Sequence, residues 1–360
     1  MDKKSSLDYF AEQKLASIEQ RGLRRVLDIT SRGLAGAATR REKRLISFCC
    51  NDYLGLSQDP KVRKAAADAI MTFGTGAGAS RLVTGNHPLY AVLERSLSDI
   101  KRSDSAVVFG SGYLANLGAI PVFAGPEDLC LSDVLAHASM HAGLRASGSK
   151  VEYFLHNDLE NCRQKLLEKR ASFKKCLILT EGVFSMDGDR APLRGLCDLA
   201  EEFEAWLFVD DAHGLGVLGD GAGSVAAAGV QKRVHLQMGT LSKSVGSYGG
   251  FLSGSSSAID LLVNRARSLI YGTGLPPAAV AASIAALDII RTDKDRISRP
   301  LRLARDFAEG LGLPEAQSAI VPLILGSSEA ALHASFELQK EGFLVAAIRP
   351  PTVPVGTARL

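Results

Sequence analysis

The strongest constraint on the fold is a regular alternation of short apolar segments with longer amphipathic segments between residues 105 and 253. The apolar segments occupy 105–109, 129–132, 176–180, 205–209, 234–238 and 250–253. Helical patterns separate most of them, at 113–123, 138–146, 158–170 and 193–204. Short strands that are apolar throughout are typical of a parallel sheet covered by helices on both faces. The alternation therefore predicts a large α/β domain with a mainly parallel sheet.

The organisation changes after Pro276-Pro277, which precede a long helix predicted at 278–291. Beyond it we expect a smaller α/β domain, with helices near 298–311 and 328–341 and strands near 318–325 and 343–348. Residues 7–27 have the pattern of an amphipathic helix, and we expect the N-terminal segment to join the smaller domain. The predicted boundaries are 1–45 for the N-terminal arm, 46–277 for the large domain and 278–360 for the small domain.

Charge, hydropathy and cysteine usage exclude several classes of function. The formal net charge of +3 over 360 residues is too small to indicate a nucleic-acid or membrane-surface partner. No apolar segment approaches the ~18 residues needed to cross a bilayer. The six cysteines contain no C-x-x-C pair, which argues against a zinc site and favours a reducing compartment. We therefore expect a cytoplasmic protein without a metal ion.

Lys243 and Asp210 are the first candidates for chemistry. Lys243 lies among small and hydroxyl-bearing residues just after the apolar segment 234–238. Asp210 directly follows the segment 205–209, and open α/β sheets bind ligands at the carboxyl ends of their strands. Pyridoxal phosphate (PLP) needs such a pair, a lysine that forms a Schiff base and an acid that keeps the pyridine nitrogen protonated. A solvated lysine and a turn-capping aspartate are the alternatives.

Other polar residues also follow predicted strands. Ser111-Gly112-Tyr113 joins the strand at 105–109 to the next helix, where backbone N–H groups can bind a phosphate. His137 follows the strand at 129–132, so its ring can stack on a flat cofactor. Each of these patterns is short and also fits a structural turn or a structural histidine. Two further candidates of the same kind are His213 and Ser185.

Together these segments resemble the α-oxoamine synthases, PLP enzymes of the aspartate-aminotransferase fold (fold type I). The resemblance runs from about residue 20 to the last residue, and its motifs occur in one order. It implies a large domain with a seven-stranded, mainly parallel sheet and a smaller α/β domain. The motifs are Asn51-Asp52-Tyr53-Leu54-Gly55-Leu56, Ser80-Arg81-Leu82-Val83-Thr84-Gly85, Ser111-Gly112-Tyr113, His137-Ala138-Ser139, Phe184-Ser185-Met186-Asp187-Gly188-Asp189, Val209-Asp210-Asp211-Ala212-His213-Gly214, Thr240-Leu241-Ser242-Lys243 and Ile348-Arg349-Pro350-Pro351-Thr352-Val353-Pro354.

The resemblance also implies a role for each candidate residue. Lys243 would form the Schiff base and move the substrate α-proton, Asp210 would pair with the pyridine nitrogen, and His137 would stack on the ring. Asn51 and Arg349 would hold the amino-acid carboxylate, and Arg24 is a candidate for the distal carboxylate of the acyl substrate. The active site would lie between the two subunits of a homodimer. The remaining cofactor contacts would be Ser111, Gly112, Tyr113, Ser185, His213, Thr240 and, across the interface, Thr273 of the partner subunit.

The motif at 348–354 most resembles family members that join L-alanine to a pimeloyl thioester in biotin synthesis. It implies a decarboxylative condensation that releases carbon dioxide and a free carrier thiol, with coenzyme A or an acyl carrier protein as the carrier. The alternatives are a glycine C-acetyltransferase, a 5-aminolevulinate synthase or a catalytically silent PLP-fold subunit. A nucleotide-binding protein is disfavoured because neither 74–78 nor 110–112 supplies a G-x-G-x-x-G or a P-loop lysine.

The chain departs from the family pattern at two places. Family members usually carry two adjacent hydroxyl residues where this chain has Gly272-Thr273. They also continue past the position of Leu360 with a further strand and a terminal helix. We therefore expect a phosphate contact with one hydroxyl fewer across the subunit interface, and a truncated small domain.

Overall fold

The computed structural model describes residues 4–360, and its contacts divide the chain into two compact units. The larger unit is Asn51–Val321, and the smaller unit combines the described residues up to Cys50 with Pro322–Leu360. This division places the helices predicted at 278–291 and 298–311 within the larger unit. The domain boundaries at 45 and 277 stay predictions, and the first three residues of the predicted arm lie outside the described residues.

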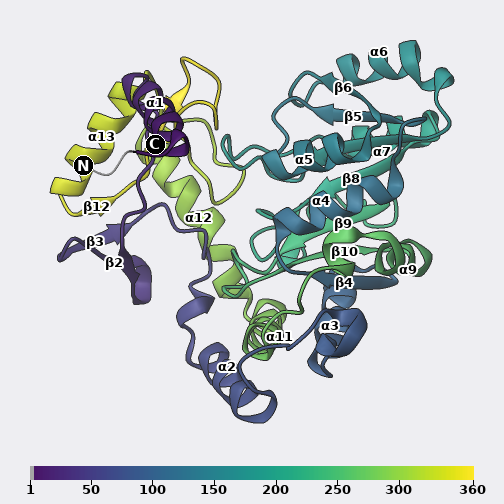
Figure 1. Cartoon of the computed structure of the whole chain (residues 1–360), viewed down its shortest axis with the longest axis horizontal. Helices are drawn as coiled ribbons and strands as arrows, with labels where there is room; N and C mark the ends of the chain where they lie inside the picture. Colours follow the sequence, from purple (N-terminus) through teal and green to yellow (C-terminus); the bar gives the residue numbers. More distant parts are fainter. Residues whose placement is uncertain (1–3) are drawn as a thin grey trace. The chain divides into compact units, whose positions relative to one another are not determined.

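The larger unit is built on a seven-stranded sheet with the strand order β4-β10-β9-β8-β7-β5-β6 (Figure 1). Strands β6, β5, β7, β8 and β9 run parallel, and β10 is antiparallel to both of its neighbours. The predicted mainly parallel sheet is therefore confirmed. The strands are β4 Ser105–Phe109, β5 Leu129–Asp133, β6 Lys150–Phe154, β7 Cys176–Glu181, β8 Trp206–Asp210, β9 Leu236–Thr240 and β10 Gly250–Gly254.

Strand β6 is the member of the sheet that the apolar pattern did not predict. It lies at the sheet edge, pairs only with β5, and has the mixed sequence Lys-Val-Glu-Tyr-Phe. Its burial is partial along most of its length, whereas β5 and β7 are buried at every position. An edge strand needs apolar side chains at fewer positions, so it gives a weaker signal in the sequence.

Helices cover both faces of this sheet (Figure 1). Successive residues of β7 alternate between two apolar clusters: Leu177 and Leu179 pack with α4 and α5, whereas Cys176 and Ile178 pack with α6 and α7. A third cluster joins β4 and β10 to α2, α3 and α11. This two-sided burial explains the uninterrupted apolar strands. The helices are α2 Pro60–Phe73, α3 Leu89–Lys101, α4 Gly112–Phe123, α5 Ala138–Ser147, α6 Leu159–Lys169, α7 Leu193–Glu202, α8 Ser224–Ala227, α9 Ser256–Arg265, α10 Arg267–Ile270, α11 Pro277–Thr292 and α12 Lys294–Gly310.

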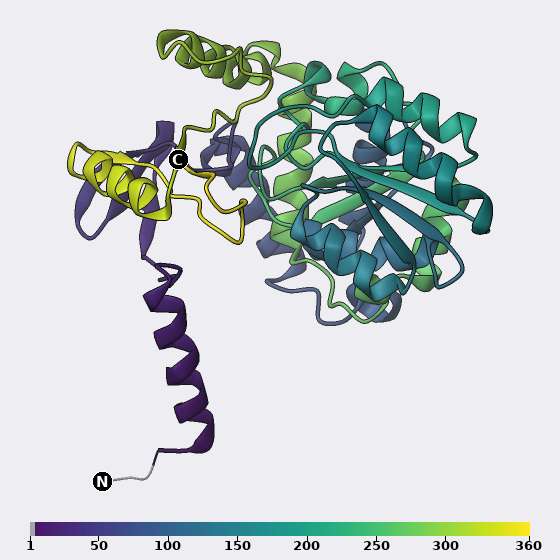
Figure 2. The same cartoon turned by 90° about the horizontal axis from the view of Figure 1, so that it is seen from above.

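The smaller unit contains a four-stranded sheet with the order β1-β2-β3-β12 and a two-stranded sheet of β11 and β13. Figure 2 shows α1, in purple, projecting from the strands of this unit, and no residue of α1 is buried. The helix predicted over 7–27 ends at Gln20, because Gly22 takes a left-handed conformation with φ of 63°. The elements are α1 Ser6–Gln20, β1 Thr30–Arg32, β2 Ala37–Arg40, β3 Lys43–Ser47, β11 Ile324–Gly326, α13 Ser328–Lys340, β12 Phe343–Leu344 and β13 Ala358–Arg359.

Two further predictions for the C-terminal segment are corrected. The strand predicted near 318–325 forms only at Ile324–Gly326. The strand predicted near 343–348 forms only at Phe343–Leu344. Among residues 4–360 no helix combines the length and apolar character needed to cross a membrane.

Candidate active site

Parallel pairing brings two acidic residues together at the carboxyl ends of neighbouring strands. Glu181 ends β7 and Asp210 ends β8, and the two residues are register partners. Both are buried, with 3% and 4% of their surface exposed. Asp210 Oδ2 accepts a hydrogen bond from Asn116 Nδ2 at 2.7 Å, and its Oδ1 accepts from the Ala212 backbone at 3.1 Å. These donors stabilise an anionic carboxylate at this position.

Lys243 lies in the tight turn that follows β9. The backbone N–H of Gly246 donates to the Lys243 carbonyl at 2.8 Å and closes this turn. Gly246 has φ of 70°, and a Cβ there would lie 2.3 Å from the backbone nitrogen of Ser57, so glycine is required. Burial lowers the pKa of Lys243, although the charges of Asp210 and Glu181 oppose that shift. At neutral pH a larger share of this amine is therefore unprotonated than in an exposed lysine, and only the unprotonated amine can act as a nucleophile or accept a proton.

His213 lies three residues beyond Asp210 and is buried. Its Nδ1 atom is 2.7 Å from the hydroxyl of Tyr53, which also lies 3.4 Å from Oδ1 of Asn51. Burial lowers the pKa of His213 well below its usual value, and the charges of Lys243 and His137 add to this shift. The predicted residues Asn51 and His213 are thus connected through Tyr53, for which the sequence indicated no role of its own.

His137 is the N-cap residue of α5, so its side chain lies at the start of that helix. Its Nδ1 atom accepts from the Ser139 backbone N–H at 3.2 Å and lies 2.6 Å from the Ser139 hydroxyl. Much of the residue is solvent-accessible, yet the surrounding atoms remove part of the ring's water and lower its pKa. Asp210 opposes this shift and Lys243 reinforces it, which places all three groups within electrostatic reach of one another.

The predicted phosphate-binding residues Ser111-Gly112-Tyr113 lie at the turn from β4 into α4. Ser111 caps α4 by accepting from the Leu114 backbone at 3.2 Å. A Cβ on Gly250 would lie 2.4 Å from the Gly112 nitrogen, so glycine lets β10 approach the start of this helix. The first N–H groups of a helix have no partner inside it, so those at the start of α4 are suited to a phosphate.

Thr240 ends β9 beside this helix start, where a Cβ on Gly112 would lie 3.4 Å from the Thr240 Cβ. The Thr240 hydroxyl donates to the Gly249 carbonyl at 2.9 Å, and its oxygen is 2.8 Å from the Ser242 hydroxyl. The Thr240 proton is therefore already used within the protein. A contact with a phosphate would need the hydroxyl to rotate or to act through Ser242.

Three predicted site residues lie outside these contacts. Thr273 forms an isolated backbone bridge with Ser80 in the larger unit. Arg24 and Arg349 belong to the smaller unit: Arg24 pairs with Glu19 at 2.7 Å, and Arg349 donates to the Gly22 carbonyl. Their roles in substrate or phosphate binding stay predictions.

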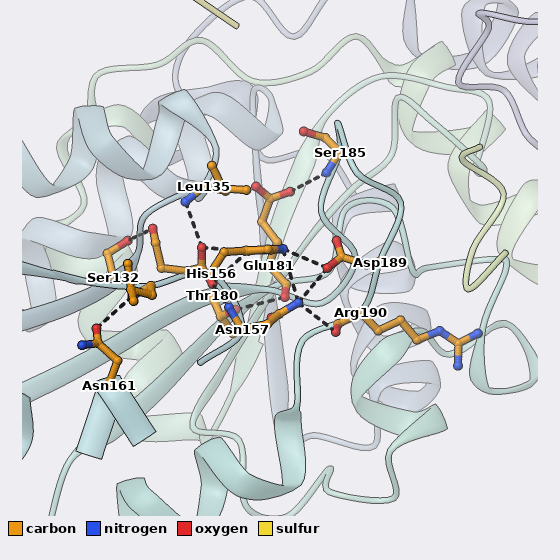
Figure 3. A network of polar contacts seen from close by, with 12 residues as sticks. Ser132, Leu135, His156, Asn157, Asn161, Thr180, Glu181, Ser185, Asp189 and Arg190 are labelled. Atoms are coloured by element: carbon orange, nitrogen blue, oxygen red, sulfur yellow. Dashed lines mark hydrogen bonds and ion pairs between the residues drawn. The ribbon is translucent and has the colours of Figure 1, made fainter. Parts of the chain in front are cut away.

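The loop that carries Ser185 is held by a polar network at the same edge of the sheet (Figure 3). The Ser185 backbone donates to Oε2 of Glu181 at 3.2 Å. Burial raises the pKa of Glu181 well above its usual value, and the nearby charge of Asp210 adds to the shift. Glu181 was not among the predicted site residues, although it directly follows a predicted strand, as Asp210 does.

His156 is the second residue of this network that was not among the predicted site residues. Its Nε2 lies 2.8 Å from Oδ2 of Asp189 (Figure 3), and its Nδ1 lies 3.1 Å from Oδ1 of Asp133, whose side chain is fully buried. Burial by itself would lower the pKa of His156, but both aspartates outweigh it and raise the pKa to about 10. A charged His156 therefore ties the Ser185 loop to the end of β5.

The chemistry of these groups fits PLP. A lysine with a lowered pKa, a buried anionic aspartate and a capped helix start are the groups that its aldehyde, ring nitrogen and phosphate require. The Ser244 hydroxyl is buried beside Lys243 and has no hydrogen-bond partner among residues 4–360. A polar ligand in this turn would give it one.

Comparison with known proteins decides the family. The sequence pattern of the family described as aminotransferase class I and II matches residues 43–360. The chain belongs to this family. Its predicted resemblance to α-oxoamine synthases is also confirmed by curated relatives. A Methylorubrum extorquens protein named 8-amino-7-oxononanoate synthase is 54% identical over 356 residues, which cover 99% of this chain and 90% of that protein. A Caulobacter vibrioides protein with the same name, provisionally given, is 56% identical over 355 residues and covers 99% and 92%.

Solved structures of the same fold confirm the predicted architecture. Serine palmitoyltransferase from Sphingomonas wittichii is 30% identical, with a TM-score of 0.91 over 100% of this chain and 92% of that one. The S. paucimobilis enzyme, solved with a PLP–myriocin adduct, is 28% identical with a TM-score of 0.91 over 99% and 92%. The 8-amino-7-oxononanoate synthase of Francisella tularensis, at 23% identity and a TM-score of 0.73 over 88% and 90%, shows the shared fold.

Proposed function

We propose that this protein joins L-alanine to a pimeloyl thioester, giving 8-amino-7-oxononanoate, carbon dioxide and the free carrier thiol. The observation that carries the proposal is the full-length identity of 54–56% to proteins named for this reaction. The predicted PLP cofactor is confirmed by the family and by the PLP-bound solved structures. The arrangement of Lys243, Asp210 and the α4 start agrees with both.

PLP, when bound, supplies an electron sink that stabilises negative charge at the α-carbon of an amino acid. Lys243 would attach the cofactor and, as a neutral amine, accept the α-proton of alanine at Nζ. Asp210 would hold a proton on the ring nitrogen, because Asn116 and Ala212 keep its carboxylate anionic. Ser111, Gly112, Tyr113 and Thr240 would hold the phosphate.

The neighbouring neutral histidines would orient the ring. His213, held by Tyr53, would act near the phenolic oxygen together with Ser185, and His137 would stack on the ring face. Asn51 and Arg349 would bind the alanine carboxylate, and Arg24 the distal carboxylate of the pimeloyl chain. We also propose a homodimer in which Thr273 of the partner subunit completes the phosphate site.

A second candidate is the use of serine and a palmitoyl thioester, because serine palmitoyltransferases share this fold at up to 31% identity. Purified protein with PLP should therefore be assayed with alanine, glycine and serine against pimeloyl, acetyl, succinyl and palmitoyl thioesters. Our proposal expects thiol release with alanine and pimeloyl thioesters above all other pairs. A preference for glycine or serine would contradict it, and PLP binding without any turnover would indicate a silent subunit.

The acyl carrier and the compartment are part of the same proposal. Parallel assays with pimeloyl-coenzyme A and pimeloyl acyl carrier protein decide between the two carriers. All six cysteines are free thiols, which fits a reducing cytoplasm.

A further inference from the structure

A continuous chain of hydrogen bonds connects His137 to Asp210. Asn116 Nδ2 lies 2.7 Å from Oδ2 of Asp210 and 2.9 Å from the Ser139 hydroxyl, which lies 2.6 Å from Nδ1 of His137. Asn116 and Ser139 are 0% and 1% exposed, so water does not compete for the two contacts of Asn116. They come from α4 and α5, two helices that pack against each other on one face of the sheet.

The direction of each hydrogen bond follows from which groups can donate. A carboxylate only accepts, so Asn116 must present its NH₂ group to Asp210. The second hydrogen of this NH₂ group points to the oxygen of Ser139. The Ser139 backbone N–H donates to Nδ1 of His137 at 3.2 Å, so this nitrogen presents a lone pair. The Ser139 hydroxyl, 2.6 Å from the same nitrogen, is therefore the donor of the second contact.

Two donors at Nδ1 define the protonation state of His137. A neutral imidazole with its proton on Nε2 accepts both hydrogen bonds, whereas a charged ring would carry a proton on Nδ1 and oppose both donors. The partial burial of the ring and the positive charge of Lys243 favour the same neutral state.

We propose that Asn116 and Ser139 are positioning residues that hold His137 as the neutral, Nε2-protonated tautomer and tie its orientation to that of Asp210. The relevance to PLP rests on the proposed function, in which His137 meets the ring face and Asp210 the ring nitrogen. The same chain of hydrogen bonds then orients both His137 and Asp210 towards the cofactor ring. A shift of α4 or α5 would therefore change the positions of both side chains.

The test uses ¹⁵N-histidine-labelled protein, whose ring-nitrogen shifts report tautomer and charge directly. The protein has seven histidines, and the spectrum of His137→Gln identifies the signals of His137. In the native protein we expect a neutral Nε2-protonated ring with a titration midpoint below the usual ~6.5. Ser139→Ala should raise the midpoint and populate the Nδ1-protonated tautomer, and Ser139→Thr should restore the native pattern.

Ser147→Ala is the matched control. Ser147 is a buried serine of the same helix, and its hydroxyl contacts Leu144 and Ser149 instead of His137. It should leave the His137 signals unchanged. Asn116→Ala is the second variant, which removes both donor hydrogens without touching the histidine. It should move the His137 signals in the same direction as Ser139→Ala. If Ser139→Ala does not fold, Asn116→Ala by itself tests whether this chain of hydrogen bonds holds the His137 tautomer.

Affinity for PLP is the second measurement. Asn116→Ala should weaken PLP binding about 10-fold, the size expected for one lost hydrogen bond to a charged group. Native His137 signals in Ser139→Ala, or an equal change in Ser147→Ala, would overturn the tautomer assignment. Native His137 signals in Asn116→Ala would overturn the link to Asp210, and native PLP affinity would overturn the positioning role. The nitrogen shifts need no cofactor, so they stay decisive even if Lys243→Ala shows the proposed PLP chemistry to be wrong.

Discussion

Lys101 and Asp211 form a fully buried ion pair, with Nζ of the lysine 2.6 Å from Oδ2 of the aspartate. The same amine donates to the Ala222 carbonyl at 2.8 Å, and both oxygens of Asp211 accept from the Ser224 backbone. Asp211 directly follows Asp210 in the sequence. The pair therefore fixes the turn after β8, which also carries His213.

Lys101→Met should destabilise the protein by about 3–5 kcal/mol, because it leaves the buried carboxylate of Asp211 without its countercharge. The measurement is urea unfolding followed by circular dichroism. Lys64→Met is the control, since Lys64 and Asp68 form an exposed pair with 75% and 62% of their side chains accessible. That variant should cost less than about 1 kcal/mol. If the two substitutions lowered the free energy of unfolding equally, the buried pair would contribute no more to stability than the exposed pair.

The pH dependence of stability should reveal the charge on His156. Its pKa rises from about 6.5 in the unfolded chain to about 10 in the folded protein. A raised folded pKa means that the stabilisation is complete below pH ~6.5 and is lost as the pH rises through ~10. The unfolding free energies of the native protein and His156→Gln should therefore differ most below pH ~6.5, differ less as the pH rises, and converge above pH ~10.

His333→Gln provides the comparison for that experiment, because the His333 side chain is 76% exposed. Its stability should follow the native curve across the whole pH range. A His156 ring that titrates near 6.5 in ¹⁵N spectra would contradict the proposal that a charged His156 holds the Ser185 loop to the end of β5.

Lys243→Ala should abolish the absorbance of protein-linked PLP and lower activity by more than about a thousandfold, the upper part of the range for a lost proton-transfer group. Borohydride reduction and mass spectrometry of the native protein should place the cofactor mass on Lys243. Lys232→Ala, at an exposed position, should bind PLP and turn over normally. PLP linked to another lysine in the native protein would exclude this assignment.

Gly250→Ala should weaken the phosphate site while leaving Lys243 in place. Its Cβ would lie 2.4 Å from the Gly112 nitrogen and 2.5 Å from the carbonyl of Ser111, so the start of α4 must shift. We expect PLP affinity to fall about 10-fold or more, measured by fluorescence titration. In Gly310→Ala the new Cβ would meet no atom within 4 Å, and the affinity should stay native. Native affinity in Gly250→Ala would argue against a phosphate at this helix.

The sequence by itself determined the α/β class, the parallel core of the sheet and the residues at its strand ends. The reason is that strands buried on both faces are mostly apolar, so β5, β7, β8 and β9 are visible in the pattern, even though β9 also buries Gln237 and Thr240. The polar residues that follow them, Asp210 above all, stand out for the same reason. The edge strand β6 lacks this constraint and was therefore not visible.

Only the tertiary structure decided which polar side chains meet. Asn116 reaches Asp210 across 94 positions of sequence, and His156 reaches Asp189 across 33. Such contacts depend on how helices and loops pack over the sheet, and hydrogen-bond partners leave no periodic signal in a single sequence. The pKa values of Lys243, His213 and Glu181 likewise follow from burial and from neighbouring charges, both of which the folded chain creates.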